Sequence, residues 1–167
     1  MTAKKPQDAI ELLDADHKAV KTMFEDYKKL AENDAAGAKR KALADQICME
    51  LTVHTKIEEE IFYPPVREAI RDDDLLDEAE VEHAGAKELI AQILSMQPDD
   101  ELYDAKVTVL GEYIDHHVKE EREEMFPKVR KTNLDLVTLG EALRIRKEEL
   151  KAVPEALRED ALAAAAA

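Results

Sequence analysis

Apolar residues recur every three or four positions along most of the chain, which is the spacing of one face of an α-helix. Residues 8 to 32 show the pattern clearly, because one face of a helix there would carry Ile10, Leu13, His17, Val20, Phe24, Tyr27 and Leu30. The same spacing predicts further helices over residues 38 to 63, 75 to 95, 101 to 126 and 134 to 152, and a short one from Pro154.

Prolines and polar residues predict where these helices begin and end. Pro64 and Pro65 remove backbone donors and predict a kink or an end after residue 63, and Pro127 does the same for the helix before it. The aspartates at 72 to 74 suit a helix N-terminus, where negative charge meets the helix dipole. Asn133 can cap the helix that follows it.

Four main helices with short connections predict an all-α fold, an up-down-up-down four-helix bundle. We assign the bundle to residues 1–132, and residues 133–167 to a C-terminal helical extension that is packed on the bundle or trails from it. No linker divides the chain into two independent domains.

The two halves of the bundle resemble each other. His54, Glu58 and Pro64 recur 63 residues later as His117, Glu121 and Pro127. His17 likewise has a counterpart 66 residues later, His83, and an acidic residue precedes each of the two. The first two helices and the next two are therefore predicted to be copies of one helical hairpin.

The charge of the chain excludes several classes of partner. The 167 residues carry a formal net charge of -15, and phosphate binding needs clustered Lys and Arg, so nucleic acid and anionic membrane surfaces are disfavoured. No apolar run approaches a membrane span, and the N-terminus has no apolar stretch for export. Cys48 is the single cysteine, which suits a reducing compartment, so we expect a cytoplasmic protein.

The repeated histidines and glutamates predict a metal site. Residues i and i+4 lie on one face of a helix, so each His projects together with the Glu that follows it. One core-facing histidine is more often a structural residue. Here, four helices each direct a histidine at one axis, and two of them add a carboxylate. Burying these groups without a cation would severely destabilise the fold. The predicted ligands are His17, His54, Glu58, His83, His117 and Glu121.

These ligands divide evenly between two ions. His17 and His54 would hold one ion, His83 and His117 the other, and the two glutamates would bridge them. Imidazole mixed with carboxylate suits iron, with manganese or zinc as substitutes, and thiolate ligands are absent.

Four segments of the chain resemble, in order and spacing, the hemerythrin-like HHE cation-binding domains: "DADHKAV", "HTKIEEEIFYP", "EHAGAKELI" and "HHVKEEREEMFP". The resemblance covers about residues 8 to 131 and implies a four-helix bundle that holds a non-haem di-iron centre, with the two Fe ions joined by an oxo or hydroxo bridge. Oxygen-carrying members of the family have a further His where this chain has Lys87, and an Asp five residues after their last His where this chain has Glu121 after four.

The pattern that remains is similar to a bacterial subgroup associated with peroxide or nitric oxide chemistry. We therefore expect a reaction with a small-molecule oxidant (hydrogen peroxide, dioxygen or nitric oxide), with peroxide consumption the favoured activity and oxidative stress its setting. A non-enzymatic module that binds or senses oxygen, nitric oxide or iron is the alternative, and a purely structural metal is a third. The expected assembly is a monomer or a weak homo-oligomer.

Residues around the ligands are predicted less directly. Tyr113 and Lys87 are candidate proton donors beside the centre. Lys21 and Lys87 are expected at the level of Glu50, where either one of them forms an ion pair with Glu50 or both extend out of the end of the bundle. His116 lies about 100° around the helix from His117, so we expect it to be structural or at the surface.

Overall fold

The computed structural model describes residue 3 and residues 5–164, and all regular structure in them is helical. The α-helices and two π-helical segments follow one another as α1 (Ala9–Glu32), α2 (Gly37–Ile57), η1 (Glu58–Phe62), α3 (Tyr63–Ile70), α4 (Asp73–Ser95), α5 (Tyr103–Glu120), η2 (Glu121–Met125), α6 (Phe126–Arg130), α7 (Leu136–Lys151) and α8 (Pro154–Ala163).

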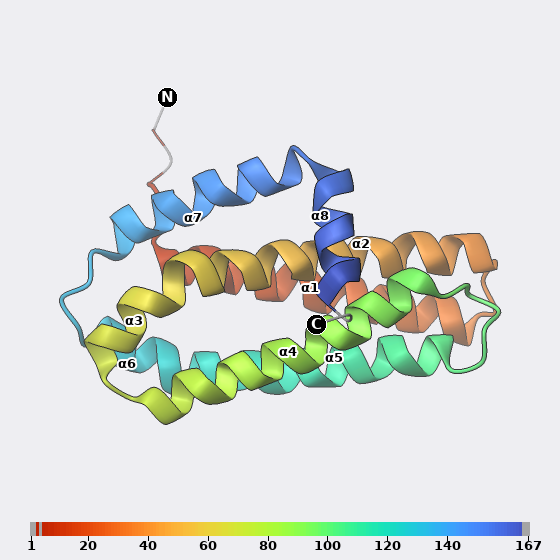
Figure 1. Cartoon of the computed structure of the whole chain (residues 1–167), viewed down its shortest axis with the longest axis horizontal. Coiled ribbons are helices and arrows are strands. Elements are labelled where there is room, and N and C mark those ends of the chain that lie inside the picture. Colours follow the sequence, from red (N-terminus) through yellow and green to blue (C-terminus); the bar gives the residue numbers. More distant parts are fainter. Residues whose placement is uncertain (1–2, 4, 165–167) are drawn as a thin grey trace.

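The long helices α1, α2, α4 and α5 form an antiparallel bundle, as predicted (Figure 1). Helix α1 packs on α2 and α5, and α4 packs on α5 and α2, so each helix has two neighbours around one axis. Helices α3 and α6 continue α2 and α5 beyond the π-helical segments and contact each other at one end of the bundle. Among the described residues, no helix combines the length and apolar character needed to cross a membrane.

Side-chain caps set the starts of several helices. Asp8 accepts a hydrogen bond from the Glu11 backbone (2.8 Å), and the Glu11 carboxylate accepts one from the Asp8 backbone (3.0 Å), which completes a capping box on α1. The prediction that Asn133 caps α7 was wrong, because Asp135 accepts the hydrogen bond from Thr138 (3.1 Å) instead.

The prediction of one uninterrupted α-helix up to each proline was also wrong. At Glu58 the α-helix gives way to a π-helical segment, and the Tyr63 amide donates to the Glu58 carbonyl five residues back. Pro64 has no amide hydrogen to donate, so a widened turn before it lets the chain continue as α3. The Phe126 amide donates to the Glu121 carbonyl in the same way before Pro127.

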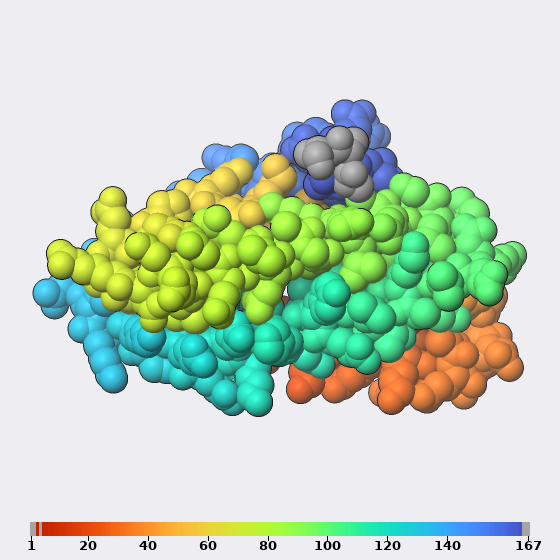
Figure 2. Space-filling model, turned by 60° about the horizontal axis from the view of Figure 1, so that its bottom comes forward, coloured from red at the N-terminus to blue at the C-terminus, as the bar shows by residue number. Residues whose placement is uncertain are grey.

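The C-terminal helices pack on the bundle. Helix α7 contacts α1 and α2, and α8 contacts α4 and α2. Figure 1 shows α7 running along the bundle and α8 turning across it, and Figure 2 shows α8 raised over α4. The last three residues of the closing alanine run, 165 to 167, lie outside the described part of the chain.

Helix α7 approaches the start of α1 at Gly140. A Cβ atom added there would lie 2.6 Å from the Gln7 carbonyl oxygen and 2.8 Å from the Ala9 nitrogen. Backbone cannot move aside as a flexible side chain can, so Gly140→Ala should destabilise the protein by about 1–3 kcal/mol. Urea denaturation checks this, with Gly85→Ala as the control, because its Cβ would meet only the Tyr113 ring at an ordinary 3.6 Å.

Two apolar clusters fill the bundle, one toward each end, and the histidines lie between them. On α1, Leu13 belongs to the first cluster and Val20 to the second, with His17 between the two. On α4, Ala79 and Ala86 flank His83 in the same way. The fold therefore places the polar residues at one level of the bundle, surrounded by apolar packing.

Candidate metal centre

The structure brings all six predicted ligands together at this level. Their side chains come from α1, α2, η1, α4, α5 and η2, and each residue is at most 7% exposed. They form two groups of potential metal-binding atoms that share Glu58. One group is His17, His54, Glu58 and Glu121, and the other is Glu58, His83 and His117.

The imidazoles face each other in pairs. The Nε2 atoms of His17 and His54 lie 3.1 Å apart, and those of His83 and His117 are also 3.1 Å apart. Two nitrogen ligands about 2.1 Å from one ion, at right angles to each other, would be about 3.0 Å apart. Each pair therefore has the separation that one shared metal ion requires.

The two glutamates lie between the pairs. One oxygen of Glu58 contacts His54 Nε2, and the other is 3.7 Å from His83 Nε2 and 3.8 Å from His117 Nε2. Oε1 of Glu121 is 3.3 Å from His17 Nε2 and 3.1 Å from His117 Nε2. Both carboxylates are thus within reach of both pairs, which is the arrangement of a bridging ligand.

A carboxylate orients one imidazole in each pair. The Nδ1 atom of His54 lies 3.2 Å from Asp16, and that of His117 lies 2.6 Å from Glu82. A carboxylate on Nδ1 holds the hydrogen there, so the Nε2 lone pair faces the centre. Asp16 is itself bound by Lys147, so helix α7 of the C-terminal extension supports this part of the site.

The histidines and glutamates of the centre shift each other's pKa values. Burial alone would lower the pKa of His54, but the charge of Glu58 and the hydrogen bond with Asp16 outweigh it and raise that pKa to about 10. Burial would raise the pKa of Glu58, but the facing His54, His117 and His83 hold it well below its usual range. Both oxygens of Glu58 are nevertheless buried without a hydrogen-bond partner among the described residues. Mixed imidazole and carboxylate donors with orphaned oxygens fit a bound cation.

Tyr63 belongs to the centre, although the helical spacing did not reveal it. Its hydroxyl lies 3.2 Å from His83 Nε2 and 3.3 Å from His117 Nε2, and it donates to Glu121 Oε2 at 3.4 Å. The corresponding residue of the second half is Phe126, which stacks on His17 with ring centroids 6.0 Å apart. At this position, the two halves of the centre therefore differ by one hydroxyl group.

The α-helical period explains why Tyr63 was missed. Five residues after Glu58, an α-helix would turn Tyr63 about 140° away from that glutamate. The π-helical segment changes this rotation and brings Tyr63 back toward the centre. An aromatic residue directly before Pro64, in a motif ending in proline in both halves, was the signal available in the sequence.

The structure does not bring Tyr113 to the centre, and Lys87 reaches only its edge. Tyr113 is 50% exposed and its ring lies near Gly85 on the outside of α4. Lys87 binds the Glu59 carboxylate at 2.6 Å, and Glu59 Oε1 is 3.8 Å from His83 Nδ1, too far for a hydrogen bond.

Two further expectations concern residues outside the centre. Glu50 accepts a hydrogen bond from Lys151 at 3.0 Å, and neither of the two candidate lysines, Lys21 and Lys87, pairs with it among the described residues. The side chain of His116 is at the surface and 65% exposed, as its angle on the helix indicated, and it lies between Glu82 and Glu120.

Comparison with known proteins identifies the family. Residues 8–129 match the "Hemerythrin HHE cation binding domain", which is most of the chain. The chain belongs to the hemerythrin HHE cation-binding family. A buried His/Glu cation site within an all-α hemerythrin-like fold is therefore the property that this chain shares with its family.

Two relatives match most of this chain but differ in how much of their own length the match covers. The uncharacterized protein Rv2633c of Mycobacterium tuberculosis is 25% identical over 130 residues, which cover 76% of this chain and 79% of that protein. A protein of Nostoc sp. named "DNA nickase" is 30% identical over 124 residues, 74% of this chain, but the match spans only 33% of that protein.

A solved structure shows the same fold. The crystal structure of a hemerythrin HHE cation-binding domain-containing protein, the Rv2633c homolog from Mycobacterium kansasii, aligns with a TM-score of 0.75 and 22% sequence identity. The alignment covers 95% of this chain and 99% of that one, so helices α7 and α8 fall largely within the shared fold.

The raised pKa values predict proton release when metal binds. His54, with a pKa of about 10, is protonated at pH 7 in the metal-free protein, and a metal ligand must be the neutral imidazole. Metal addition at pH 7 should therefore release protons, and release from His54 should cease as the pH rises through about 10. Calorimetric titration in buffers of different ionisation enthalpy measures this, and an unchanged heat across buffers would contradict it.

Proposed function

We propose that this protein binds two iron ions in the buried centre and consumes hydrogen peroxide. The observation that carries the proposal is the division of six buried ligands into two equivalent imidazole pairs joined by Glu58 and Glu121. Two adjacent iron ions supply redox and Lewis-acid chemistry when bound. Each side of the centre offers two imidazoles and shares the two carboxylates, so each bound ion would have a position left for the oxidant.

The surrounding residues limit what can reach the centre. A small cavity of about 10 Å³ borders the four histidines, and Val20, Leu51, Ile114 and Val118 are among its walls. A cavity of this size holds about one water molecule. So small a space at the histidines leaves no room for an organic substrate, which favours a small oxidant over a larger one.

Tyr63 holds a proton beside the centre. Burial and the charges of Glu121 and Glu58 raise the pKa of its hydroxyl well above its usual range, so the phenol is protonated at neutral pH. The hydroxyl can therefore donate a hydrogen bond to an oxygen species bound between the histidine pairs. It lies on the His83–His117 side, so the two halves of the centre are not equivalent in this respect.

Oxygen-carrying members of the family have an extra histidine ligand at one position, and the residue at that position in this chain argues against oxygen transport. Lys87 stands there and is bound to Glu59 rather than to the centre. The two metal positions then have the same number of histidine ligands. This favours a centre at which the oxidant can reach both ions.

The decisive experiment combines metal analysis with two functional assays. We expect two iron ions per chain, catalytic peroxide consumption, and its loss in Glu58→Ala and Glu121→Ala. Reduced protein exposed to oxygen and then to argon separates consumption from carriage. Recovery of the starting spectrum over several cycles, without peroxide consumption, would establish a carrier and overturn the proposal.

A more specific prediction concerns the Tyr63 hydroxyl. Tyr63→Phe should retain both metal ions but lower kcat for peroxide by about 10- to 100-fold, since one positioned donor is lost. Phe126→Tyr is the matched control, because it changes the corresponding position of the other half. Equal effects of the two variants, or unchanged kcat in Tyr63→Phe, would remove the hydroxyl from the mechanism.

The nicking activity in the name of the Nostoc relative is not part of this proposal. The match spans a third of that protein. The net charge of -15 also opposes binding to a phosphate backbone.

A further inference from the structure

A second group of potential metal ligands lies on the surface, where α4 and α5 run side by side (Figure 2). Glu82 of α4 and His116 and Glu120 of α5 each offer one ligand atom, and the three atoms lie within 4.8 Å of one another. We call these three residues the outer triad. None of them is fully buried, and the side chain of His116 is 65% exposed, so a dissolved ion can reach the group.

The separations within the outer triad suit one tetrahedral ion. His116 Nε2 lies 3.4 Å from Glu82 Oε1 and 3.2 Å from Glu120 Oε1. Two ligands about 2.1 Å from a tetrahedral ion are about 3.4 Å apart. Zinc binds imidazole and carboxylate in this geometry, and water completes its coordination where the protein supplies three ligands. The outer triad therefore has the ligand number and type of a zinc site that is open to solvent.

The environment of Glu82 favours a cation at this place. Glu82 is the counterpart of Asp16, because each uses one carboxylate oxygen to orient a histidine of the buried centre. The other oxygen of Asp16 is bound by the ammonium group of Lys147. Among the described residues, no lysine or arginine lies within 4.0 Å of Glu82, and a second carboxylate, Glu120, is its neighbour instead. A cation between the two carboxylates would balance both charges.

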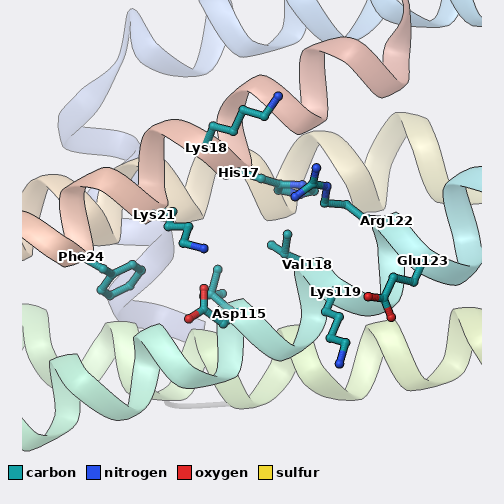
Figure 3. Close-up of a pocket in the computed structure, with 10 residues that line it drawn as sticks. His17, Lys18, Lys21, Phe24, Asp115, Val118, Lys119, Arg122 and Glu123 are labelled. Atoms are coloured by element: carbon teal, nitrogen blue, oxygen red, sulfur yellow. The ribbon is translucent and has the colours of Figure 1, made fainter.

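The surface around the outer triad attracts cations. It is a hollow of about 590 Å³ whose other walls include Asp74, Asp77 and Glu78. Arg67 offsets part of this charge, because it binds Asp77 at 2.9 Å. The pocket in Figure 3, between α1 and α5, carries charge of the opposite sign, and its cationic lining residues are Lys18, Lys21, Lys119 and Arg122. A metal ion that approaches α5 is therefore drawn to the outer triad and repelled from that pocket.

We propose that the outer triad binds one divalent metal ion, with zinc the best fit, and that this ion neutralises Glu82 as Lys147 neutralises Asp16. The ion is additional to those in the buried centre and exchanges with solvent, so gel filtration removes it. Since Glu82 also accepts the hydrogen bond from His117, the bound ion fixes the carboxylate that orients this histidine. The proposal goes beyond the reaction with peroxide and does not depend on it.

Zinc uptake measures the outer site directly. Protein whose buried centre is filled with zinc and then passed through gel filtration should take up one further zinc ion, saturably, in equilibrium dialysis. Glu120→Gln should weaken this uptake about ten-fold or more, since losing a ligand costs at least as much affinity as losing a residue that orients one. Glu78→Gln is the matched control, because it removes the same charge from the same hollow at a residue outside the triad. Equal weakening in both variants, or no saturable further ion, would overturn the proposal.

A fixed positive charge should replace the ion. Glu120→Lys places an ammonium group beside Glu82, as Lys147 does beside Asp16. Zinc at a hundred times its Kd for the outer site should raise the melting temperature of the gel-filtered wild type by about 5–10 °C. Glu120→Lys should melt at least as high as the wild type without added zinc, and zinc should not raise it further. An equal rise in Glu120→Lys would place the ion elsewhere, and a lower melting temperature without zinc would refute the need for a cation at Glu82.

Discussion

His117→Ala is expected to lose about one of the two metal ions, whereas His116→Ala, on the next residue, should retain both. His117 lies 3.1 Å from His83 through their Nε2 atoms and is buried beside Glu121. His116 is 65% exposed and contacts Glu82 and Glu120 at the surface. Removing one of two imidazoles from an ion leaves too few ligands to hold it tightly. Metal analysis after gel filtration measures the difference.

His54→Ala provides the matching result for the other ion and should also lose about one equivalent. The opposite pattern, two ions in His117→Ala and one in His116→Ala, would mean that the metal binds at the surface group of Glu82, His116 and Glu120. Circular dichroism of each variant distinguishes metal loss from unfolding.

Removal of the metal is expected to lower the melting temperature by about 8–16 °C. A ligand present at a thousand times its Kd stabilises the native state by about 4 kcal/mol, and for a chain of this size each kcal/mol shifts Tm by about 2–4 °C. The physical reason is that Glu58 and Glu121 are at most 1% exposed, and without the metal only protonated histidines compensate their charge. Thermal melts before and after chelation, with metal added back, measure the change.

The metal-free protein should also respond to pH in a defined direction. The folded-state pKa of Glu58 is lowered, so its stabilisation is present above the unfolded pKa and is lost as the pH falls through the folded value. The folded-state pKa of His54 is raised to about 10, so its stabilisation is complete below its ordinary value of 6.5 and is lost as the pH rises through about 10. A metal-free protein as stable as the holo form would show that the cation does not compensate these charges.

Local physics was enough to predict the bundle and the position of its polar layer. Apolar spacing gave helices close to their observed bounds, and the capping box of Asp8 and Glu11 starts α1 where a first helix was expected. The i, i+4 spacing of His54 and Glu58 predicted that their side chains lie together, because residues four apart share one face of any α-helix. The duplication of that motif then implied a common axis, and the structure brings the predicted residues to it.

Interactions between distant segments decided the rest. The π-helical turn before Pro64 rotates Tyr63 into the centre, and α-helical spacing cannot anticipate that turn. Lys147 reaches Asp16 because α7 packs back on α1. The sequence alone determined which residues share a helix face, since that depends on backbone geometry within a few residues. Which faces meet, and what lies between them, depends on packing across the bundle, so only the tertiary structure decided it.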